Sequence, residues 1–383
     1  MNADATSMTL PPDGRLIVVS DIHGQLAYLK GLLDKINFTP RDRLLIVGDL
    51  TERGESCLKT LRFIMALCRE GRCAVSMGNV ETKQLDMLDN TAPDADHALA
   101  ELSRSMKRYW GHSTFDDMAR ELGFPLDTDS DGVIALFRAH FAEEIAFIRS
   151  LPTMIDAGDY LFVHGGVPTD NVPSLVGQDA HGFLKNDDFL GHAARYRRWV
   201  VVGHWPVVNY NPRRPDYAPL IDRKRRVISL DGGCGIKRYG QLNALILRAG
   251  QPGFETAAWD PFEIRTALDP QPEFDEGLHV RFGHNELRLL NTDADTARVE
   301  WIEGKTTLTV PASFIYREHG KPFLSEYTTY RPAVSPGDRL SVLGTFGCLT
   351  LVKKDSIVGW YAGRLDAPSP AAVKTNVNRK SED

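Results

Sequence analysis

Short apolar runs that each lead into a polar residue dominate the first 250 residues of this sequence. Residues 15–20 form such a run and are followed by Asp21, and residues 43–47 lead into a glycine-bounded loop that holds Asp49. Helical patterns separate these runs, and strands that alternate with helices predict βαβ units and a parallel sheet. Because ligands bind at the carboxyl ends of parallel strands, the polar residues of these loops are expected to meet.

Three later strands follow the same rule. One runs into Asn79, while residues 160–164 and 199–204 are apolar runs whose last residues are His164 and His204. Each run is bounded by glycine or polar turns, as expected of short strands. Carboxylate, amide and imidazole side chains are therefore predicted to converge.

These side chains have the composition of a metal site, and the candidate ligands are Asp21, His23, Asp49, Asn79, His164 and His204. Oxygen ligands mixed with imidazole suit manganese, iron, zinc or cobalt better than calcium. A single Asp-x-His at a strand end is more often a loop cap or a satisfied histidine, but five such loops in one chain favour a site. Asp49 is the natural bridge between two divalent ions because a carboxylate has two oxygens. Manganese is the favoured ion, with iron, zinc or cobalt as alternatives.

Five segments resemble, in order and in loop placement, the motifs of a known family. They are SDIHGQ at 20–25, GDLTERG at 48–54, GNVE at 78–81, HGG at 164–166 and GH at 203–204. Together they are similar to the bacterial type of the phosphoprotein-phosphatase branch of the calcineurin-like metallophosphoesterases. The resemblance covers roughly residues 15–249, and it implies an α/β fold with a four-layer αββα sandwich.

The resemblance also implies roles for individual residues. The expected ligands are Asp21, His23 and Asp49 for the first metal ion, and Asp49, Asn79, His164 and His204 for the second. Arg53 would bind the phosphate group, because its guanidinium offers two charge-assisted hydrogen bonds to phosphate oxygens. The implied reaction is attack on phosphorus by a hydroxide that bridges the two ions.

The sequence departs from the family at the general acid. Members usually carry His after the Gly-Asn pair and Asp before the phosphate-binding Arg, whereas Val80 and Glu52 stand here. General acid catalysis contributes about 10²- to 10⁴-fold, so its loss affects poor leaving groups most. Glu52 could serve as the acid, His97 or His112 could replace it, or the substrate could be an activated ester or an anhydride. The catalytic set is accordingly Asp49, Arg53 and Glu52.

Two further positions differ from the family. Bacterial relatives often place a second phosphate-binding Arg between the two last histidines, where this chain has Lys185 and Asn186. The predicted substrate-binding set is therefore Arg53, Asn79 and Lys185. Trp205 follows the Gly-His pair in place of a small hydroxyl residue, and it could either stack on a substrate ring or fill the core.

The predicted activity is metal-dependent hydrolysis of phosphomonoesters, with phosphoserine or phosphothreonine of proteins among the candidate substrates. A phosphodiesterase or a nucleotide-polyphosphate hydrolase is the alternative, which the missing His favours. A third alternative is a catalytically weak scaffold that binds peptides. The intact set of ligands speaks against this last interpretation.

The domain plan follows from changes in pattern along the chain. A catalytic domain is expected over residues 15–260, with a helical insertion at about 93–151. Short alternating segments over 270–366 predict an all-β region, which resembles one or two SH3-like barrels. Residues 1–14 and 367–383 are expected to be flexible tails. Trp360 and Tyr361 of the β region could recognise a peptide partner, or they could be ordinary strand aromatics.

Bulk properties restrict location and partners. A formal net charge of −6 speaks against a broad nucleic-acid footprint, and the one dense basic run, at 223–226, reads as a turn before a strand. The N-terminus lacks an apolar stretch, which argues against secretion and against a membrane partner. Five cysteines without CxxC spacing fit free thiols in a cytoplasmic protein.

Overall fold

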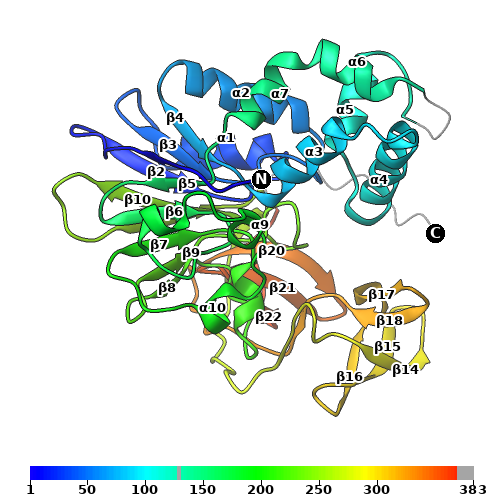
Figure 1. Cartoon of the computed structure of the whole chain (residues 1–383). Coiled ribbons are helices and arrows are strands. Elements are labelled where there is room, and N and C mark those ends of the chain that lie inside the picture. The colour runs from blue at the N-terminus through cyan, green and yellow to red at the C-terminus, as the bar shows by residue number, and fades with distance from the viewer. Residues whose placement is uncertain (127–130, 369–383) are drawn as a thin grey trace. The chain divides into compact units, whose positions relative to one another are not determined.

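The computed structural model describes residues 1–126 and 131–368, and the chain divides into two compact units (Figure 1). The first unit comprises residues 1–207 and 218–260, and the second comprises 208–217 and the chain from 261 onward. Residues 208–217 were predicted to be part of the catalytic domain, but they belong to the second unit. None of the helices in the described part of the chain has the length and apolar character needed to cross a membrane.

Two β-sheets form the centre of the first unit. The five-stranded sheet has the order β11-β10-β2-β3-β4 and contains β2 (Arg15–Val19), β3 (Arg43–Val47), β4 (Cys73–Ser76), β10 (Leu242–Arg248) and β11 (Glu255–Trp259). The six-stranded sheet has the order β1-β5-β6-β7-β9-β8 and contains β1 (Ala5–Ser7), β5 (Met154–Asp156), β6 (Tyr160–Val163), β7 (Trp199–Val202), β8 (Leu220–Asp222) and β9 (Val227–Ser229). Strands β2, β3 and β4 are mutually parallel, as are β6, β7 and β9.

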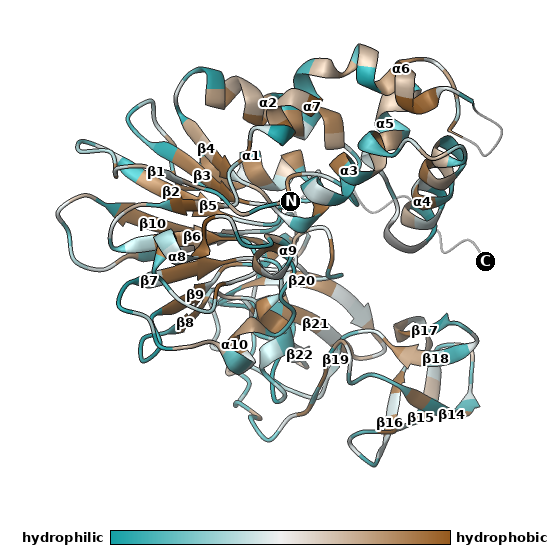
Figure 2. Cartoon of the chain, viewed as in Figure 1, coloured by the Kyte–Doolittle hydropathy of each residue, from teal (hydrophilic) through white to brown (hydrophobic). Residues whose placement is uncertain are grey.

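The two sheets pack face to face through one hydrophobic core. Leu16 and Leu45 of the first sheet share this core with Phe162, Val201 and Ile228 of the second, and all five are at most 1% exposed. Figure 2 shows the corresponding strands as the most hydrophobic part of the unit. Runs of leucine and β-branched residues with both faces covered are typical of parallel strands. The shared core fixes how the strand ends of one sheet meet those of the other.

Helices follow the parallel strands of the first sheet. They are α1 (Leu26–Lys35), α2 (Cys57–Arg69) and α3 (Asn79–Asp89). In α1 the buried residues Leu29, Leu32 and Leu33 form the stripe that a helix presents to a sheet. The parallel connection from β6 to β7 must cross on the face away from the core, and it contains the one-turn helices α8 (Val172–Leu175), α9 (His181–Leu184) and α10 (Phe189–His192). The layer order is helix, sheet, sheet and a reduced helical layer.

Four helices occupy the range of the predicted insertion. They are α4 (Ala95–Trp110), α5 (Thr114–Glu121), α6 (Val133–His140) and α7 (Ala142–Arg149). Ser113 caps α5 by accepting a hydrogen bond from the backbone N–H of Phe115. Phe115, Phe137 and Phe141 are buried and their rings contact one another, so the insertion has a small core of its own.

The second unit is all-β in its described part, as predicted. A four-stranded antiparallel sheet has the order β12-β20-β21-β22 and contains β12 (Glu263–Thr266), β20 (Arg339–Phe346), β21 (Leu349–Lys354) and β22 (Ile357–Tyr361). A three-stranded sheet contains β14 (Leu287–Thr292), β15 (Thr296–Trp301) and β16 (Thr306–Pro311), and two pairs join β13 (His279–Val280) to β19 (Tyr327–Thr328) and β17 (Ile315–Glu318) to β18 (Lys321–Leu324). The SH3-like assignment stays a prediction. The expected tail at 367–383 lies outside the described residues from 369 onward.

The N-terminal segment is ordered, contrary to the flexible tail expected over residues 1–14. Strand β1 pairs in parallel with β5, and Ala3 is 2% exposed. The backbone N–H of Ala3 donates to the Gln178 carbonyl (2.7 Å), and its carbonyl accepts from Gly177 N (2.8 Å). The strand has three residues and two hydroxyl side chains, so its sequence lacks the apolar alternation that marks longer strands.

Deleting residues 1–9 is expected to lower the melting temperature of the chain. The deletion removes the edge strand and its backbone hydrogen bonds, a loss of about 2 kcal/mol that corresponds to about 4–8 °C for a unit of this size. Thermal unfolding followed by circular dichroism measures the change. A melting temperature equal to that of the full chain would instead support the flexible tail.

Candidate metal centre

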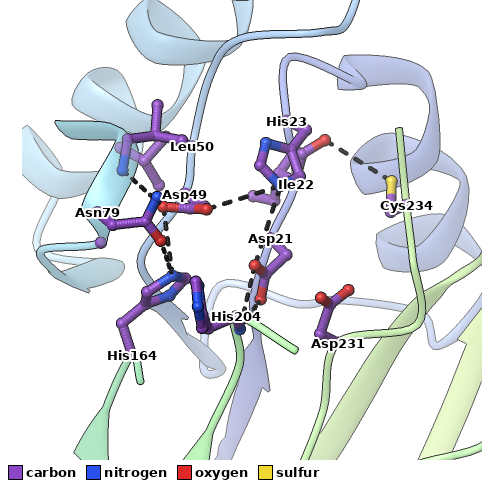
Figure 3. A network of polar contacts seen from close by, with 12 residues as sticks. Asp21, Ile22, His23, Asp49, Leu50, Asn79, His164, His204, Asp231 and Cys234 are labelled. Carbon is purple, nitrogen blue, oxygen red and sulfur yellow. Dashed lines mark hydrogen bonds and ion pairs between the residues drawn. The ribbon is translucent and has the colours of Figure 1, made fainter. Parts of the chain in front are cut away.

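The six predicted ligands lie where parallel strands end. They follow β2, β3, β4, β6 and β7 in chain order: Asp21 and His23, Asp49, Asn79, His164 and His204. Figure 3 shows their side chains directed toward a common space from both sheets. The sequence rule worked because the carboxyl ends of the parallel strands in the two packed sheets point to the same edge.

Asp21, His23 and Asp49 form a first group, and one ligand atom from each lies within 4.8 Å of the others. Nε2 of His23 is 3.9 Å from Asp21 Oδ1 and 3.7 Å from Asp49 Oδ2, which is too long for hydrogen bonds. The same Nε2 is buried and has no hydrogen-bond partner among the described residues. Its ring is oriented by a contact of Nδ1 with the Thr51 carbonyl (3.2 Å). An orphaned imidazole nitrogen facing two carboxylates fits a divalent ion.

Asp49, His164 and His204 form a second group with the same 4.8 Å closeness of ligand atoms. Nε2 of His164 lies 3.3 Å from Asp49 Oδ1 and 3.1 Å from Asn79 Oδ1. Nδ1 of His164 contacts the Val47 carbonyl (2.9 Å), which assigns the proton to Nδ1 and leaves Nε2 as a ligand. Asp49 belongs to both groups and occupies the position expected of a bridging carboxylate.

The charges of the buried carboxylates and histidines favour the binding of cations in this centre. Burial raises the pKa of Asp21 well above its usual value, and the charge of Asp231 raises it further. Burial lowers the pKa of His164, but the charges of Asp49 and Asp21 together outweigh burial and raise this pKa to about 10. Burial lowers the pKa of His23 to about 3. Buried carboxylates in this number are stabilised when cations bind among them.

Backbone strain is concentrated in this centre. A positive φ is uncommon for residues with a side chain, and such angles cluster at functional sites. Positive φ angles occur at six site residues: Asp21 (54°), His23 (49°), Asp49 (55°), Glu52 (66°), Arg53 (69°) and His204 (66°). The strained loops that follow β2, β3 and β7 turn the chain sharply, so that their side chains face the common space.

The site includes carboxylates that the sequence analysis did not assign, among them Glu81 and Asp187. Glu81 accepts hydrogen bonds from the backbone N–H groups of Asp49 (2.9 Å) and Leu50 (2.8 Å), so it fixes the loop that carries the bridging ligand. Asp187 accepts from Nε2 of His204 (2.7 Å) and from Nζ of Lys185 (2.7 Å). The sequence could have identified Glu81 through its capping position at the start of α3. It could not have identified Asp187, which lies in an irregular segment.

A cavity of about 500 Å³ opens beside the ligands. Its polar and charged lining includes Asp49, Glu52, Arg53, Asn79, Lys83, His181, Lys185 and His204. Its apolar lining includes Val80, Leu102, Met106, Phe115 and Ile236. Leu102, Met106 and Phe115 come from the helical insertion, which therefore walls the site.

The predicted phosphate-binding and acid residues fall on this cavity. The backbone N–H of Arg53 donates to the His112 carbonyl (3.1 Å), which fixes the loop between Glu52 and Gly54. Glu52 is 3% exposed, and its carboxylate accepts from Nε2 of Gln84 (2.6 Å) and from the backbone N–H of Thr114 (3.2 Å). Burial raises the pKa of Glu52.

Three other sequence candidates lie elsewhere. His97 is exposed, and Nε2 of His112 is held by Asp117 Oδ1 (2.9 Å). Neither histidine is among the described residues that line the cavity, and the half-buried Trp205 is not among them either. The structure therefore gives no support to His97 or His112 as the acid, or to ring stacking by Trp205.

The two aromatic candidates of the β region differ from each other. Tyr361 is fully buried, and its hydroxyl donates to the Asp269 carbonyl (2.7 Å), so it is a core residue. Trp360 is 6% exposed and lines a cavity of about 730 Å³ within the second unit, together with Tyr327 and Phe346. Because its side chain faces the core, Tyr361 fits the alternative of an ordinary strand aromatic.

Replacing Gly203 by alanine is expected to weaken binding of metal at the first group. A Cβ at this position would lie 2.2 Å from Asp21 Oδ2, so the Asp21 carboxylate would have to move. Displacing one carboxylate ligand is expected to lower Mn²⁺ affinity by at least about tenfold. Isothermal titration of the metal-free chain with Mn²⁺ measures this.

Gly182→Ala is the matched control, because its Cβ meets nothing within 4 Å. Equal Mn²⁺ affinity in the two alanine variants would contradict the assignment of Asp21 to the metal centre.

Comparisons with known proteins agree with this geometry. A family model described as calcineurin-like phosphoesterase matches residues 14–227, a range that contains all six ligands. A Pseudomonas putida protein named bis(5'-nucleosyl)-tetraphosphatase, symmetrical, is 41% identical over 260 residues, which cover 56% of this chain and 84% of that protein. A relative of the same name from Pectobacterium atrosepticum is 32% identical over 174 residues, covering 42% of this chain and 59% of the relative. The chain thus spans less than two thirds of this second relative.

Solved structures show more distant likeness. A putative diadenosine tetraphosphatase has a TM-score of 0.43 and 19% identity, covering 67% of this chain and 99% of its own. A serine/threonine phosphatase from Saccharomyces cerevisiae, described as similar to human phosphatase PP5, has a TM-score of 0.41 and 15% identity, covering 68% of this chain and 84% of its own.

Proposed function

Because the chain belongs to the calcineurin-like phosphoesterase family, we propose that it hydrolyses phosphoanhydride bonds of nucleotide polyphosphates with the help of two divalent metal ions. Family membership confirms the predicted metallophosphoesterase fold and the class of phosphoric ester hydrolases. The names of the curated relatives favour the polyphosphate alternative over the phosphomonoesters that we placed first on sequence grounds. A small phosphoester substrate is proposed accordingly, and a peptide partner has no support.

Val80 is the observation that carries this proposal. It stands where a general acid is expected, it is 8% exposed, and its side chain lines the cavity. Its backbone N–H donates to Asp49 Oδ1 (3.0 Å), so the position is fixed next to the bridging ligand. Valine has no proton to give. An alkoxide leaving group needs that proton, whereas a phosphate leaving group, with a second pKa of about 6, departs without it.

The cavity also suits a polyphosphate chain joined to a nucleoside. Arg53, Lys83 and Lys185 supply positive charge beside the metal ligands, and cations of this kind bind the oxygens of successive phosphates. The apolar residues Leu102 and Ile236 line the same cavity and offer a surface for a base. A volume of about 500 Å³ lies within the range of small-molecule sites, about 300–1,000 Å³.

Each site residue receives a role in this proposal. The six candidate ligands would hold two divalent ions, with manganese favoured, and such ions would lower the pKa of water and neutralise phosphate oxygens. Arg53, Asn79 and Lys185 would orient the phosphates, and Asp187 restrains Lys185 through its 2.7 Å contact. Asp49 would contribute to both metal positions.

Glu52 remains a candidate proton donor. Nε2 of Gln84 faces three acceptors, namely Glu52 Oε1 (2.6 Å), Thr51 Oγ1 (2.8 Å) and Thr114 Oγ1 (2.9 Å), while its Oε1 has no partner among the described residues. A protonated Glu52 agrees with its raised pKa, which follows from burial.

The proposal predicts a substrate preference. Diadenosine tetraphosphate is expected to be hydrolysed with a kcat/KM at least about 100-fold above that for phenyl phosphate, because only the phenolate leaving group suffers from the missing acid. Steady-state assays with Mn²⁺ measure both substrates, with bis(4-nitrophenyl) phosphate as the diester. Asp49→Asn controls for contaminating activity. Preference for a monoester would restore the phosphatase reading, and preference for the diester would indicate a phosphodiesterase.

The apolar residues of the cavity predict that shortening one of them weakens only substrates that carry a nucleobase. Leu102→Ala is expected to raise the KM for diadenosine tetraphosphate about fivefold to tenfold, because roughly 40–50 Å² of apolar contact is lost at about 25 cal/mol per Å². Inorganic tripolyphosphate lacks a base, and its KM should not change. Leu136→Ala is the control, since Leu136 is 44% exposed and belongs to the same insertion. An equal change for both substrates would rule out base contact at Leu102.

A further inference from the structure

Asp231 is a buried carboxylate of the metal centre with one unused oxygen. It follows β9, the strand next to β7, and it is fully buried. Oδ1 accepts a hydrogen bond from the backbone N–H of Gly233 (2.7 Å), whereas Oδ2 has no hydrogen-bond partner among the described residues. A carboxylate oxygen is an acceptor, and a buried acceptor is normally paired. A donor other than the described residues of the chain is therefore expected at Oδ2.

The neighbours of Asp231 identify that donor. Figure 3 shows Asp231 beside Asp21, on the side away from His164. After burial, the charge of Asp231 is the largest influence on the pKa of Asp21, so the two carboxylates lie close together. His164 lowers the pKa of Asp231 and Asp49 raises it, so the charges of both ligand groups reach this carboxylate. Its direct neighbour in Figure 3 is Asp21, a residue of the first ligand group alone.

The first ligand group leaves room for water ligands. It contains three protein residues, Asp21, His23 and Asp49, whereas Asn79 adds a fourth candidate ligand beside Asp49, His164 and His204 of the second. Manganese and related ions take more than three ligands, so water would fill the remaining positions of an ion held by the first group. Water bound to a divalent ion is a strong hydrogen-bond donor, and carboxylates near metal sites commonly accept from such water.

We propose that Asp231 is a positioning residue of the first metal ion, which it holds by accepting a hydrogen bond from a water ligand of that ion. The carboxylate adds negative charge next to a site with two carboxylates of its own. It would therefore raise the affinity for a divalent cation and fix the orientation of the water. The role concerns metal binding alone and holds for any substrate that the enzyme uses.

Asp231→Asn separates this role from a merely structural one. The asparagine carbonyl can still accept from Gly233 N, so the turn after β9 is retained. Removing one of several crowded carboxylates is expected to leave the melting temperature of the metal-free chain equal or higher. The same change places an N–H toward the water ligand, so one of the two Mn²⁺ sites is expected to weaken by about 10- to 100-fold.

Titration of the metal-free protein with Mn²⁺, by calorimetry and by electron paramagnetic resonance, measures both sites. In a His204→Asn background the second site is already impaired, and Asp231→Asn must then weaken the remaining one. Asp42→Asn is the matched control: Asp42 is 2% exposed, and its carboxylate accepts from Arg15 Nε (3.0 Å) and Thr39 N (2.8 Å). This control should lower the melting temperature and leave both Mn²⁺ affinities unchanged.

Unchanged Mn²⁺ affinities in Asp231→Asn would overturn the proposal, as would a lower melting temperature of the metal-free variant without a change in affinity. A wild-type chain that binds none of Mn²⁺, Fe²⁺, Co²⁺ and Zn²⁺ would overturn it as well.

Discussion

The placement of one buried carboxylate, Asp49, is the constraint on which the rest of the centre depends. Its side chain contacts His164 at 3.3 Å and faces His23 at 3.7 Å, so it joins the ligands of the two sheets. Its backbone N–H is held by Glu81, and its carbonyl accepts from His23 N. The loop after β3 is thus tied to both neighbouring loops. A shift of this loop would disturb both ligand groups at once.

The fold provides this placement through a shared core and through strained loops. Because the two sheets pack face to face, the ends of β2 and β3 lie opposite those of β6 and β7. At Asp21 and His204 a positive φ turns the side chain into the space between them. Such conformations cost about 1–3 kcal/mol each and persist only where the surroundings enforce them. The buried strands supply that support.

Sequence reasoning selected the candidate ligands by a simple rule, namely a polar residue directly after an apolar strand, and the structure brings these residues together. Asp231 also follows an apolar strand, since β9 ends at Ser229, but the sequence analysis did not select it. Asp187 has no periodic context, and its role depends on the fold that brings it to His204. The three-residue strand β1 was not predicted for a related reason. It forms through long-range pairing with β5, and its own sequence pattern does not indicate a strand.

The joint replacement at positions 52 and 80 has a physical explanation in the structure. Glu52 uses its carboxylate to accept from Gln84 and from the first backbone N–H of α5, so the acidic group serves the helical insertion. A histidine at position 80 would lack the acidic partner that normally supports it, and valine instead continues the apolar wall formed by Leu102 and Met106. The apolar wall and the absence of a histidine acid therefore follow from the same residue, Val80. A site that lacks the histidine acid but offers apolar surface and cations is suited to leaving groups that are already stable anions.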